Sequence, residues 1–322
     1  MDYLDIKKAA DRIKGVATRT NLLTSVELDR LTGSNIYLKP ECLQKTGSFK
    51  FRGAYNCLAQ IPDKDKANGV VAFSSGNHAQ GVAFAANLLG MPATILMPHD
   101  APKIKIARTR AHGANVILFD RVKQNREEMG AEISQNTGAS LIKPFDNEHI
   151  IAGQGTAGLE VVEDLAEIGV VLDSYLVPTS GGGLLAGNSL VFKHFSPETE
   201  LFAVEPNLYN DHAKSFEKGE QVAIDEEAGN SICDALQVKI PGDLTFAINK
   251  NTVKAGLCVS DVEVIAAMKF AMDYLNLVVE PSGAVALAAV MSGKINVKNK
   301  KVGLILSGGN VDMDDLLALL QR

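Results

Sequence analysis

Cysteine is scarce in this chain of 322 residues, and the sequence also lacks low-complexity tracts and internal repeats. The absence of repeats argues against a solenoid. None of the cysteines is paired in the C-x-x-C spacing typical of zinc and redox sites. Scattered cysteines without such motifs predict reduced thiols rather than a disulfide framework. The four cysteines are Cys42, Cys57, Cys233 and Cys258.

Three further absences limit the partners of the protein. No apolar run is long enough to cross a bilayer. The first residues, MDYLDIKKAADRIK, carry charge from the second position, unlike a signal peptide. Basic residues are not in excess, because 32 Lys and Arg face 38 Asp and Glu, for a net charge of -6. A nucleic-acid binder needs a basic face. We therefore expect a cytoplasmic protein that binds neither membranes nor nucleic acid.

Short β-rich runs alternate with helical patterns along most of the chain. Each run is almost continuously apolar and is closed by Pro, Ser or Asp, as expected for parallel strands covered on both faces. This alternation predicts an α/β fold with open, mostly parallel sheets. The predicted strands are residues 35–39, 69–75, 92–98, 114–120, 139–145, 174–180, 200–206 and 301–307.

The strand–helix units fall into two sets, which suggests two domains. Four units lie between about residues 60 and 146, and a second set runs from about residue 150 to the end. The early strand NIYLK has no sheet of its own and is expected to join the second set. We therefore predict a small domain, 60–146, inserted in a large one, 1–59 plus 147–322. The active site is expected in the crevice between them.

Two segments before and within the small domain carry reactive or polar groups. In KTGSFKFRGAYN, Lys50 stands between two phenylalanines, which could desolvate the amine, lower its pKa and make it a nucleophile. Taken alone, a solvated lysine at a helix start is the better explanation of this segment, although helix starts disfavour cations. In SSGNHAQG, a strand end passes into a helix whose N–H groups suit a carboxylate. Helix capping alone would explain one of these polar residues but not the cluster of Ser74, Ser75, Asn77 and His78.

Two glycine-rich segments also follow strands. PTSGGGLLAGN has three consecutive glycines before a helix, which lets backbone N–H groups approach an anion such as phosphate. LILSGGNVD ends a strand at Ser307 and is weaker evidence, because Ser-Gly-Gly is common in turns. The triple-glycine segment also fits G-x-G-x-x-A, and Glu205 lies near the spacing of a ribose-binding acid. An NAD(P)-dependent oxidoreductase and a non-catalytic amino-acid binding protein therefore remain alternatives.

Taken together, the motifs resemble those of fold-type II pyridoxal-phosphate enzymes, in the threonine dehydratase and serine racemase family. The resemblance runs almost from end to end of the chain. It implies the tryptophan synthase β-like fold, pyridoxal 5'-phosphate as cofactor, a small amino-acid substrate and a homodimer. The motifs that support it are KTGSFKFRGAYN, SSGNHAQG, IAGQGT, SGGGLLAG, EPSGAVALAA and LSGGNVD.

The resemblance implies roles for particular residues. Lys50 would form the Schiff base with the cofactor, and Phe49 would lie beside the cofactor ring. Ser307 would meet the pyridine nitrogen, and its hydroxyl would not enforce a protonated ring, which favours β-elimination over transamination. The ring oxygen would bind Asn77, the phosphate would bind Gly181, Gly182, Gly183 and Leu184, and the substrate carboxylate would bind Ser74, Ser75, Asn77 and His78.

The expected activity is removal of water and ammonia from a β-hydroxy amino acid such as L-threonine or L-serine. Ser75 matches the position of the second acid/base in serine racemases, and the same serine occurs in 3-hydroxyaspartate dehydratases. Racemisation and 3-hydroxyaspartate dehydration therefore stay open as alternatives.

A divalent cation is also implied by the resemblance. Glu205, the carbonyl of Tyr209 and Asp211 match the cation ligands of racemase-like members. Carboxylates and a carbonyl suit Mg²⁺, Ca²⁺ or Mn²⁺. Read without the resemblance, the two acids could equally be solvated surface residues.

Overall fold

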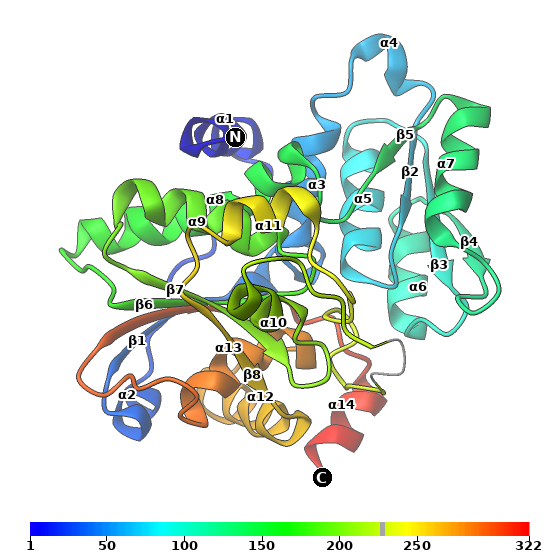
Figure 1. Cartoon of the computed structure of the whole chain (residues 1–322). Helices are drawn as coiled ribbons and strands as arrows, with labels where there is room; N and C mark the ends of the chain where they lie inside the picture. The colour runs from blue at the N-terminus through cyan, green and yellow to red at the C-terminus, as the bar shows by residue number, and fades with distance from the viewer. Residues whose placement is uncertain (226–228, 322) are drawn as a thin grey trace.

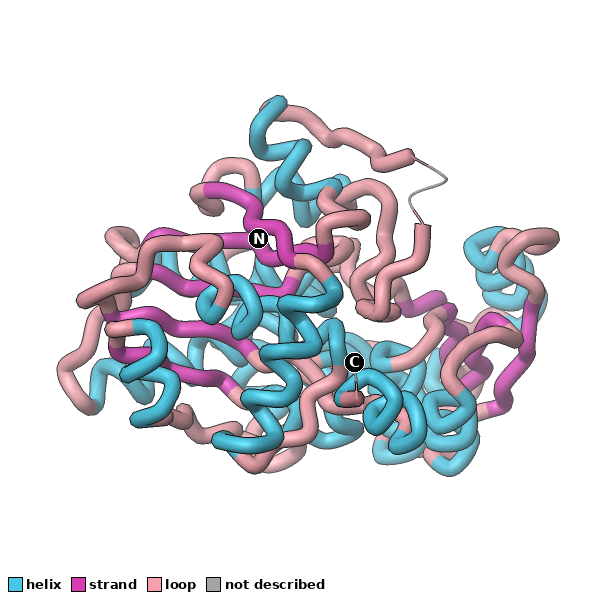
Figure 2. Tube along the Cα trace, turned by 90° about the horizontal axis from the view of Figure 1, so that it is seen from below, coloured by secondary structure: helices cyan, strands magenta, loops and turns pink. Residues whose placement is uncertain are grey.

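The computed structural model describes residues 1–225 and 229–321, and its strands form two separate sheets (Figures 1 and 2). Every strand pair is parallel. The five-stranded sheet has the order β1 (Asn35–Lys39), β9 (Lys301–Ile305), β6 (Ser174–Pro178), β7 (Glu200–Pro206) and β8 (Ala255–Val259). The four-stranded sheet has the order β4 (Asn115–Phe119), β3 (Ala93–Pro98), β2 (Val70–Phe73) and β5 (Ser140–Ile142).

Helices cover both faces of each sheet, so the predicted α/β class with two parallel sheets is confirmed. The helices are α1 (Tyr3–Ile13), α2 (Val26–Thr32), α3 (Lys50–Leu58), α4 (Asp63–Lys66), α5 (Asn77–Leu88), α6 (Lys103–Ala111), α7 (Arg126–Thr137), α8 (Glu148–Glu167), α9 (Gly183–Phe195), α10 (Asp211–Lys218), α11 (Asp243–Asn249), α12 (Asp261–Leu275), α13 (Pro281–Met291) and α14 (Met313–Leu320). Two short 3-10 turns, η1 (Glu41–Leu43) and η2 (Lys45–Gly47), precede α3.

The hydrophobic core follows this layering. On the five-stranded sheet, α2, α12, α13 and α14 pack against one face, and α8 and α9 pack against the other (Figure 1). On the four-stranded sheet, α5 and α6 cover one face and α7 covers the other. Burial of such apolar faces is the main driving force for folding. Helix α3 packs against α5 and against α8, so it lies where the two halves of the molecule meet.

Helix boundaries follow local chemistry. Helix α12 begins with a capping box in which Ser260 and Glu263 satisfy each other's free N–H groups. The side-chain oxygen of Asn147 accepts hydrogen bonds from the first free N–H groups of α8 and so caps this helix. The glycines Gly33 and Gly138 end α2 and α7 in the left-handed conformation that glycine adopts without strain.

The predicted strands were found, with two differences. Strand β8, an edge strand, was missed because its sequence AGLCV begins with Ala and Gly, which are both depleted in strands. Some strands also end earlier than predicted, because β2 ends at Phe73 and β6 at Pro178, so Ser74–Ser75 and Thr179–Ser180 lie in the loops that follow. We propose the domain division 1–59 plus 147–322 and 60–146 because every strand of the four-stranded sheet falls within the second range.

All four cysteines are free thiols. None of the helices in the described part of the chain is both long and apolar enough to span a membrane.

Candidate active site

A cavity of about 550 Å³ opens where the carboxyl ends of the strands from both sheets meet. This is the position expected for a ligand site in open parallel sheets. The four segments singled out from the sequence all reach it, although they are far apart in the chain. The cavity is lined by Phe49, Lys50, Ser74, Ser75, Asn77, His78, Gly181, Gly182, Gly183, Leu184 and Ser307, among others.

Lys50 is the first residue of α3, and its amine is held inside the cavity. Its Nζ donates a hydrogen bond to the carbonyl of Pro144 at 2.8 Å and lies 5.1 Å from the ring centre of Phe49. No carboxylate neutralises this amine in the described residues, and burial lowers the pKa of Lys50 to about 8. A fraction of the amine is therefore uncharged and nucleophilic near neutral pH.

The loop between β2 and α5 presents donors to the same cavity. The hydroxyl of Ser74 accepts a hydrogen bond from the backbone N–H of Gly76 at 3.1 Å, which shapes the turn. The first N–H groups of α5 have no carbonyl partner within the helix, as at any helix start. A carboxylate is favoured there by these donors and by the helix dipole.

The ring of His78 forms a hydrogen bond with the backbone beside the cavity. Its Nε2 lies 3.2 Å from the carbonyl of Ile142. Burial, and then the charge of Lys50, lower the pKa of His78 to about 3. The neutral ring donates its one proton to Ile142, so the backbone N–H of His78 is the group that remains for a carboxylate.

Asn77 belongs to a buried hydrogen-bonded group that sequence reasoning missed. Its side-chain nitrogen donates to Glu280, and its oxygen accepts from Asn310 at 2.9 Å. Glu280 also pairs with Lys105 at 3.1 Å. Since a side-chain amide has two N–H donors, one can still face a ligand. These contacts fix the orientation of Asn77 at the cavity.

The triple-glycine loop joins β6 to α9 and turns its N–H groups toward the cavity. The carbonyl of Gly181 accepts from the hydroxyl of Thr245 at 2.6 Å, and that of Gly182 accepts from Asn249 at 3.2 Å. Across the described chain, the N–H groups of Gly181, Gly182, Gly183 and Leu184 have no hydrogen-bond acceptor. Carbonyls tied behind the loop and free N–H groups in front of it fit a phosphate.

Alanine at position 182 is expected to weaken cofactor binding. Gly182 has a φ of +89°, and a Cβ there would lie 2.7 Å from Nε2 of His212 and 2.9 Å from Oγ1 of Thr245. Backbone strain of about 1–3 kcal/mol in the loop should lower the affinity for pyridoxal phosphate by roughly 10- to 100-fold. Titration of the cofactor-free protein, followed by absorbance, measures this affinity.

Gly219→Ala is the matched control for that experiment. Gly219 also has a positive φ, +76°, but no atom lies within 4 Å of a Cβ at this site. We expect it to lose stability without losing cofactor affinity. Equal affinity losses in both variants would mean that the glycine loop has no specific part in holding the cofactor.

Ser307 lies at the end of β9 and is nearly buried, at 5% exposure. Its carbonyl accepts a hydrogen bond from the N–H of Phe49 at 3.2 Å. This contact joins the segment that carries Lys50 to the segment that follows β9. The predicted cofactor-facing residues Phe49 and Ser307 are thus neighbours in the structure.

Glu205 and Asp211 are brought together at the end of β7 and the start of α10, and both are buried. Glu205 accepts hydrogen bonds from the N–H groups of His212 at 3.0 Å and Ala213 at 2.8 Å. Burial raises the pKa of Glu205 above its usual value. These acids are therefore not solvated surface residues, and Glu205 is not free to bind a ribose. The hydroxyl of Tyr209 donates to the carbonyl of Gly229 at 2.9 Å.

His212 is an unexpected member of this cluster. It is fully buried, and its Nδ1 lies 3.5 Å from one oxygen of Glu205 and 3.5 Å from one of Asp211. Burial opposes the charged imidazole, but the two nearby carboxylates outweigh it and raise the pKa of His212 to about 9. Two buried acids with few donors suit a cation, and both oxygens of Asp211 lack a hydrogen-bond partner.

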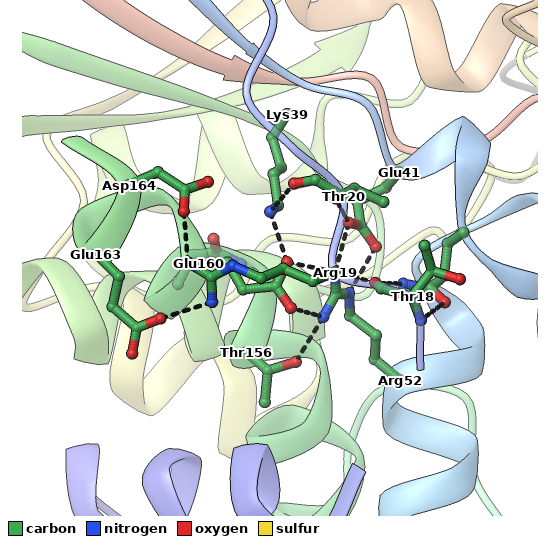
Figure 3. Close-up of polar contacts among 12 residues, drawn as sticks. Thr18, Arg19, Thr20, Lys39, Glu41, Arg52, Thr156, Glu160, Glu163 and Asp164 are labelled. Atoms are coloured by element: carbon green, nitrogen blue, oxygen red, sulfur yellow. Dashed lines mark hydrogen bonds and ion pairs between the residues drawn. The ribbon is translucent and has the colours of Figure 1, made fainter. Parts of the chain in front are cut away.

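Behind Lys50, a buried ionic network holds α3 in place (Figure 3). Arg52 binds both oxygens of Glu41, at 2.7 and 2.8 Å, and both oxygens of Glu160, at 2.7 and 2.8 Å. Lys39 also binds Glu160, at 2.6 Å. Residues two apart on a helix point in nearly opposite directions, so Arg52 faces this network while Lys50 faces the cavity.

Comparison with known proteins gives a consistent picture. The family model described as "Pyridoxal-phosphate dependent enzyme" matches residues 13–308. The chain is 44% identical to the L-threo-3-hydroxyaspartate ammonia-lyase of Pseudomonas sp over 319 residues, 99% of this chain and 98% of that protein. It is 44% identical to the L-threonine ammonia-lyase of Thermotoga maritima over 318 residues, 99% of this chain and 78% of that protein.

A solved structure is similar as well. The structure of maize serine racemase has a TM-score of 0.92 and 37% sequence identity, and the match covers 99% of this chain and 97% of that one. These matches agree with the buried amine, the glycine-rich loop and the layered fold described above. They replace the nicotinamide interpretation of the glycine loop. The chain belongs to the family of pyridoxal-phosphate dependent enzymes.

Proposed function

We propose that this protein is an ammonia-lyase that converts a β-hydroxy amino acid, such as L-threonine or L-serine, to a 2-oxo acid and ammonia. The observation that carries this proposal is the meeting of three features in one cavity. These are the low-pKa amine of Lys50, the glycine loop with free N–H groups, and the serine–asparagine loop at the start of α5. The ammonia-lyases among the relatives support the same chemistry.

Each feature has a task in this reaction. When bound, the cofactor supplies an electron-withdrawing ring that makes the α-proton of the substrate acidic. The loop at 74–78 binds the substrate carboxylate and so fixes which bond faces the reactive groups. The uncharged Nζ of Lys50 can then take the α-proton, since burial lowers its pKa to about 8 and leaves part of the amine uncharged near neutral pH. The carbonyl of Pro144, 2.8 Å away, orients this amine.

Racemisation is a second candidate activity, because Ser75 also lines the cavity. A hydroxyl on the opposite side of the substrate from Lys50 would return the proton to the other face. D-serine formed from L-serine by the wild-type protein, but not by Ser75→Ala, would support this role. If the wild-type protein forms no D-serine, this candidate falls.

The proposed activity is tested by incubating the cofactor-loaded protein with L-threonine, L-serine and L-threo-3-hydroxyaspartate in turn. Release of 2-oxo acid and ammonia in equal amounts, together with a change in cofactor absorbance, is the expected result. If none of the three yields a 2-oxo acid, the ammonia-lyase proposal is wrong.

We propose further that Glu205, Asp211 and the carbonyl of Tyr209 hold Mg²⁺, or Ca²⁺ or Mn²⁺. Removing the ion with a chelator should lower the melting temperature, because two buried acids would then lose their counter-charge. A ligand at a hundredfold excess over its Kd stabilises the folded state by about 2.7 kcal/mol, and returning Mg²⁺ should restore this amount. Thermal unfolding with chelator and with Mg²⁺ measures the effect.

The metal experiment has a matched pair of variants. Asp211→Asn should remove the response to Mg²⁺, whereas Glu220→Gln should keep it, because Glu220 is exposed and pairs only with Lys218 among the described residues. Identical melting curves with chelator and with Mg²⁺ would show that the cluster holds no such ion and that His212 balances the acids alone.

The homodimer and the cytoplasmic location stay predictions. Sedimentation of the purified protein at several concentrations tests the first.

A further inference from the structure

Two arginines line the active-site cavity, and neither has a part in the reaction described so far. Arg121 follows β4, and Arg126 is the first residue of α7. Both line the cavity that contains Lys50, and both also line an adjoining hollow. Ser74 and Ser75 border the same two spaces. The arginines therefore share a boundary with the loop proposed to bind the substrate carboxylate.

Arg126 is placed where a cation is unfavourable. Its guanidinium makes a favourable cation–π contact with Phe73, at 5.4 Å from the ring centre, but in the described part of the chain it forms no ion pair. Burial lowers the pKa of Arg126, Glu127 opposes this shift, and the charge of Arg121 adds to it. Its position at a helix start is also unfavourable for a cation. These costs would be offset by an anionic ligand.

The start of α7 does not itself supply the missing anion site. The side-chain oxygen of Asn125 already accepts hydrogen bonds from the N–H groups of Glu127 and Glu128, at 2.9 and 3.4 Å. The side chains of the arginines, rather than the backbone of the helix, are thus the groups open to a ligand.

Arg121 is held in position by a single carboxylate oxygen. Its Nε and Nη2 lie 2.9 and 2.8 Å from Oδ1 of Asp100. The side chain of Arg121 is 46% exposed, and within the described residues its Nη1 forms no hydrogen bond or ion pair. A guanidinium offers five N–H donors, so this tether leaves donors for a second carboxylate.

The acids of the cavity do not neutralise the two arginines. Asp234 and Glu280 line it, but both are paired with Lys105, at 2.6 and 3.1 Å. Because these two acids are paired with Lys105, the cavity keeps an excess of positive charge on the side of the four-stranded sheet. One substrate carboxylate at the serine loop does not remove this excess.

We infer that Arg121 and Arg126 bind a second, distal carboxylate, so that the preferred substrate is a β-hydroxy amino dicarboxylate of the 3-hydroxyaspartate type. This inference rests on the proposed ammonia-lyase function and names its substrate class. The Cα–H and Cβ–O bonds of the substrate break, a Cα=Cβ bond forms and water leaves. The released enamine gains a proton at Cβ and loses one from nitrogen to become an imine. Hydrolysis of the C=N bond of this imine consumes one water and releases ammonia and the 2-oxo dicarboxylate.

The test compares substrates with and without the distal carboxylate. In Arg121→Gln and Arg126→Gln, kcat/KM for L-threo-3-hydroxyaspartate should fall by about 10- to 100-fold, as expected for loss of a hydrogen bond to a charged group. The value for L-serine should stay unchanged. Arg126→Lys keeps the charge but loses the forked geometry of the guanidinium. Its kcat/KM for L-threo-3-hydroxyaspartate should therefore lie between the values of the wild-type protein and of Arg126→Gln. Arg110→Gln removes an exposed arginine of α6 outside the cavity and should change neither substrate.

The outcomes separate this inference from the proposed function. If the wild-type protein acts on L-serine or L-threonine but not on 3-hydroxyaspartate, the distal-carboxylate site is wrong and the ammonia-lyase stands. Equal losses on both substrates in the variants would also overturn it, because they indicate a structural role. If no substrate reacts, the distal-carboxylate site is tested by binding of succinate, a dicarboxylate without the amino and hydroxyl groups. It should raise the melting temperature of the cofactor-free wild-type protein but not of the double variant, and an equal response in both would overturn the inference.

Discussion

Replacing Lys50 with alanine is expected to reduce turnover of every substrate by more than about a thousandfold. Within the cavity, Lys50 is the amine with the lowered pKa, about 8, and it has no carboxylate partner in the described residues. Lys105 cannot replace it, because Asp234 and Glu280 raise its pKa against the opposing effect of burial and keep it charged. Steady-state release of 2-oxo acid measures the loss.

Two controls belong to this experiment. Lys45→Ala removes a lysine of the same segment that does not line the cavity, and its turnover should stay near the wild-type value. An added small amine should restore part of the rate of Lys50→Ala, because it can supply the missing base. If Lys50→Ala keeps normal turnover, the assignment of Lys50 is wrong.

The same amine predicts a pH dependence. Its pKa is lowered, so the charged form dominates below about pH 8 and the nucleophilic form dominates above it. Capture of pyridoxal phosphate by the cofactor-free protein should therefore speed up as the pH rises and level off above about 8. A rate that keeps rising toward pH 10 would mean that the amine has the pKa of an ordinary solvated lysine.

Much of the site could be predicted because each part is local in sequence. Lys50, the loop at 74–78 and the triple glycine each follow a strand or begin a helix, where backbone geometry constrains the residue types. The carboxyl ends of parallel strands meet at one edge of a sheet, which is why these separate segments share one cavity. Strand β8 escaped prediction because its first two residues, Ala and Gly, have low strand propensity.

The missed residues act through contacts that are distant in sequence. Arg121 lies in a polar turn and Arg126 begins the helix after it, a segment that looks solvated until the fold places it at the cavity. His212 gave no metal-ligand spacing, since its partner Glu205 lies on the preceding strand. Arg52 and Glu160 are 108 positions apart, and no local pattern indicates that they pair.

Replacing Arg52 with leucine is expected to cost the folded state about 3–5 kcal/mol. Arg52 is fully buried and binds Glu41 and Glu160 through two pairs of hydrogen bonds. Burial raises the pKa of Glu41, but Arg52 outweighs this and holds it below its usual value, so Glu41 is charged at neutral pH. Without Arg52, the buried carboxylates would outnumber their cations. Urea unfolding, followed by circular dichroism, measures the difference.

Two variants separate the buried pair from ordinary loss of a side chain. Arg19→Ala breaks the exposed ion pairs to Glu163 and Asp164 beside the network and should cost no more than about 1 kcal/mol (Figure 3). Adding Glu41→Leu to Arg52→Leu should recover part of the loss, because Lys39 and Glu160 then remain as a balanced pair. If the double variant loses as much free energy of unfolding as the two single variants together, charge balance is not what the network contributes. The contribution of Arg52 would then come from packing behind Lys50.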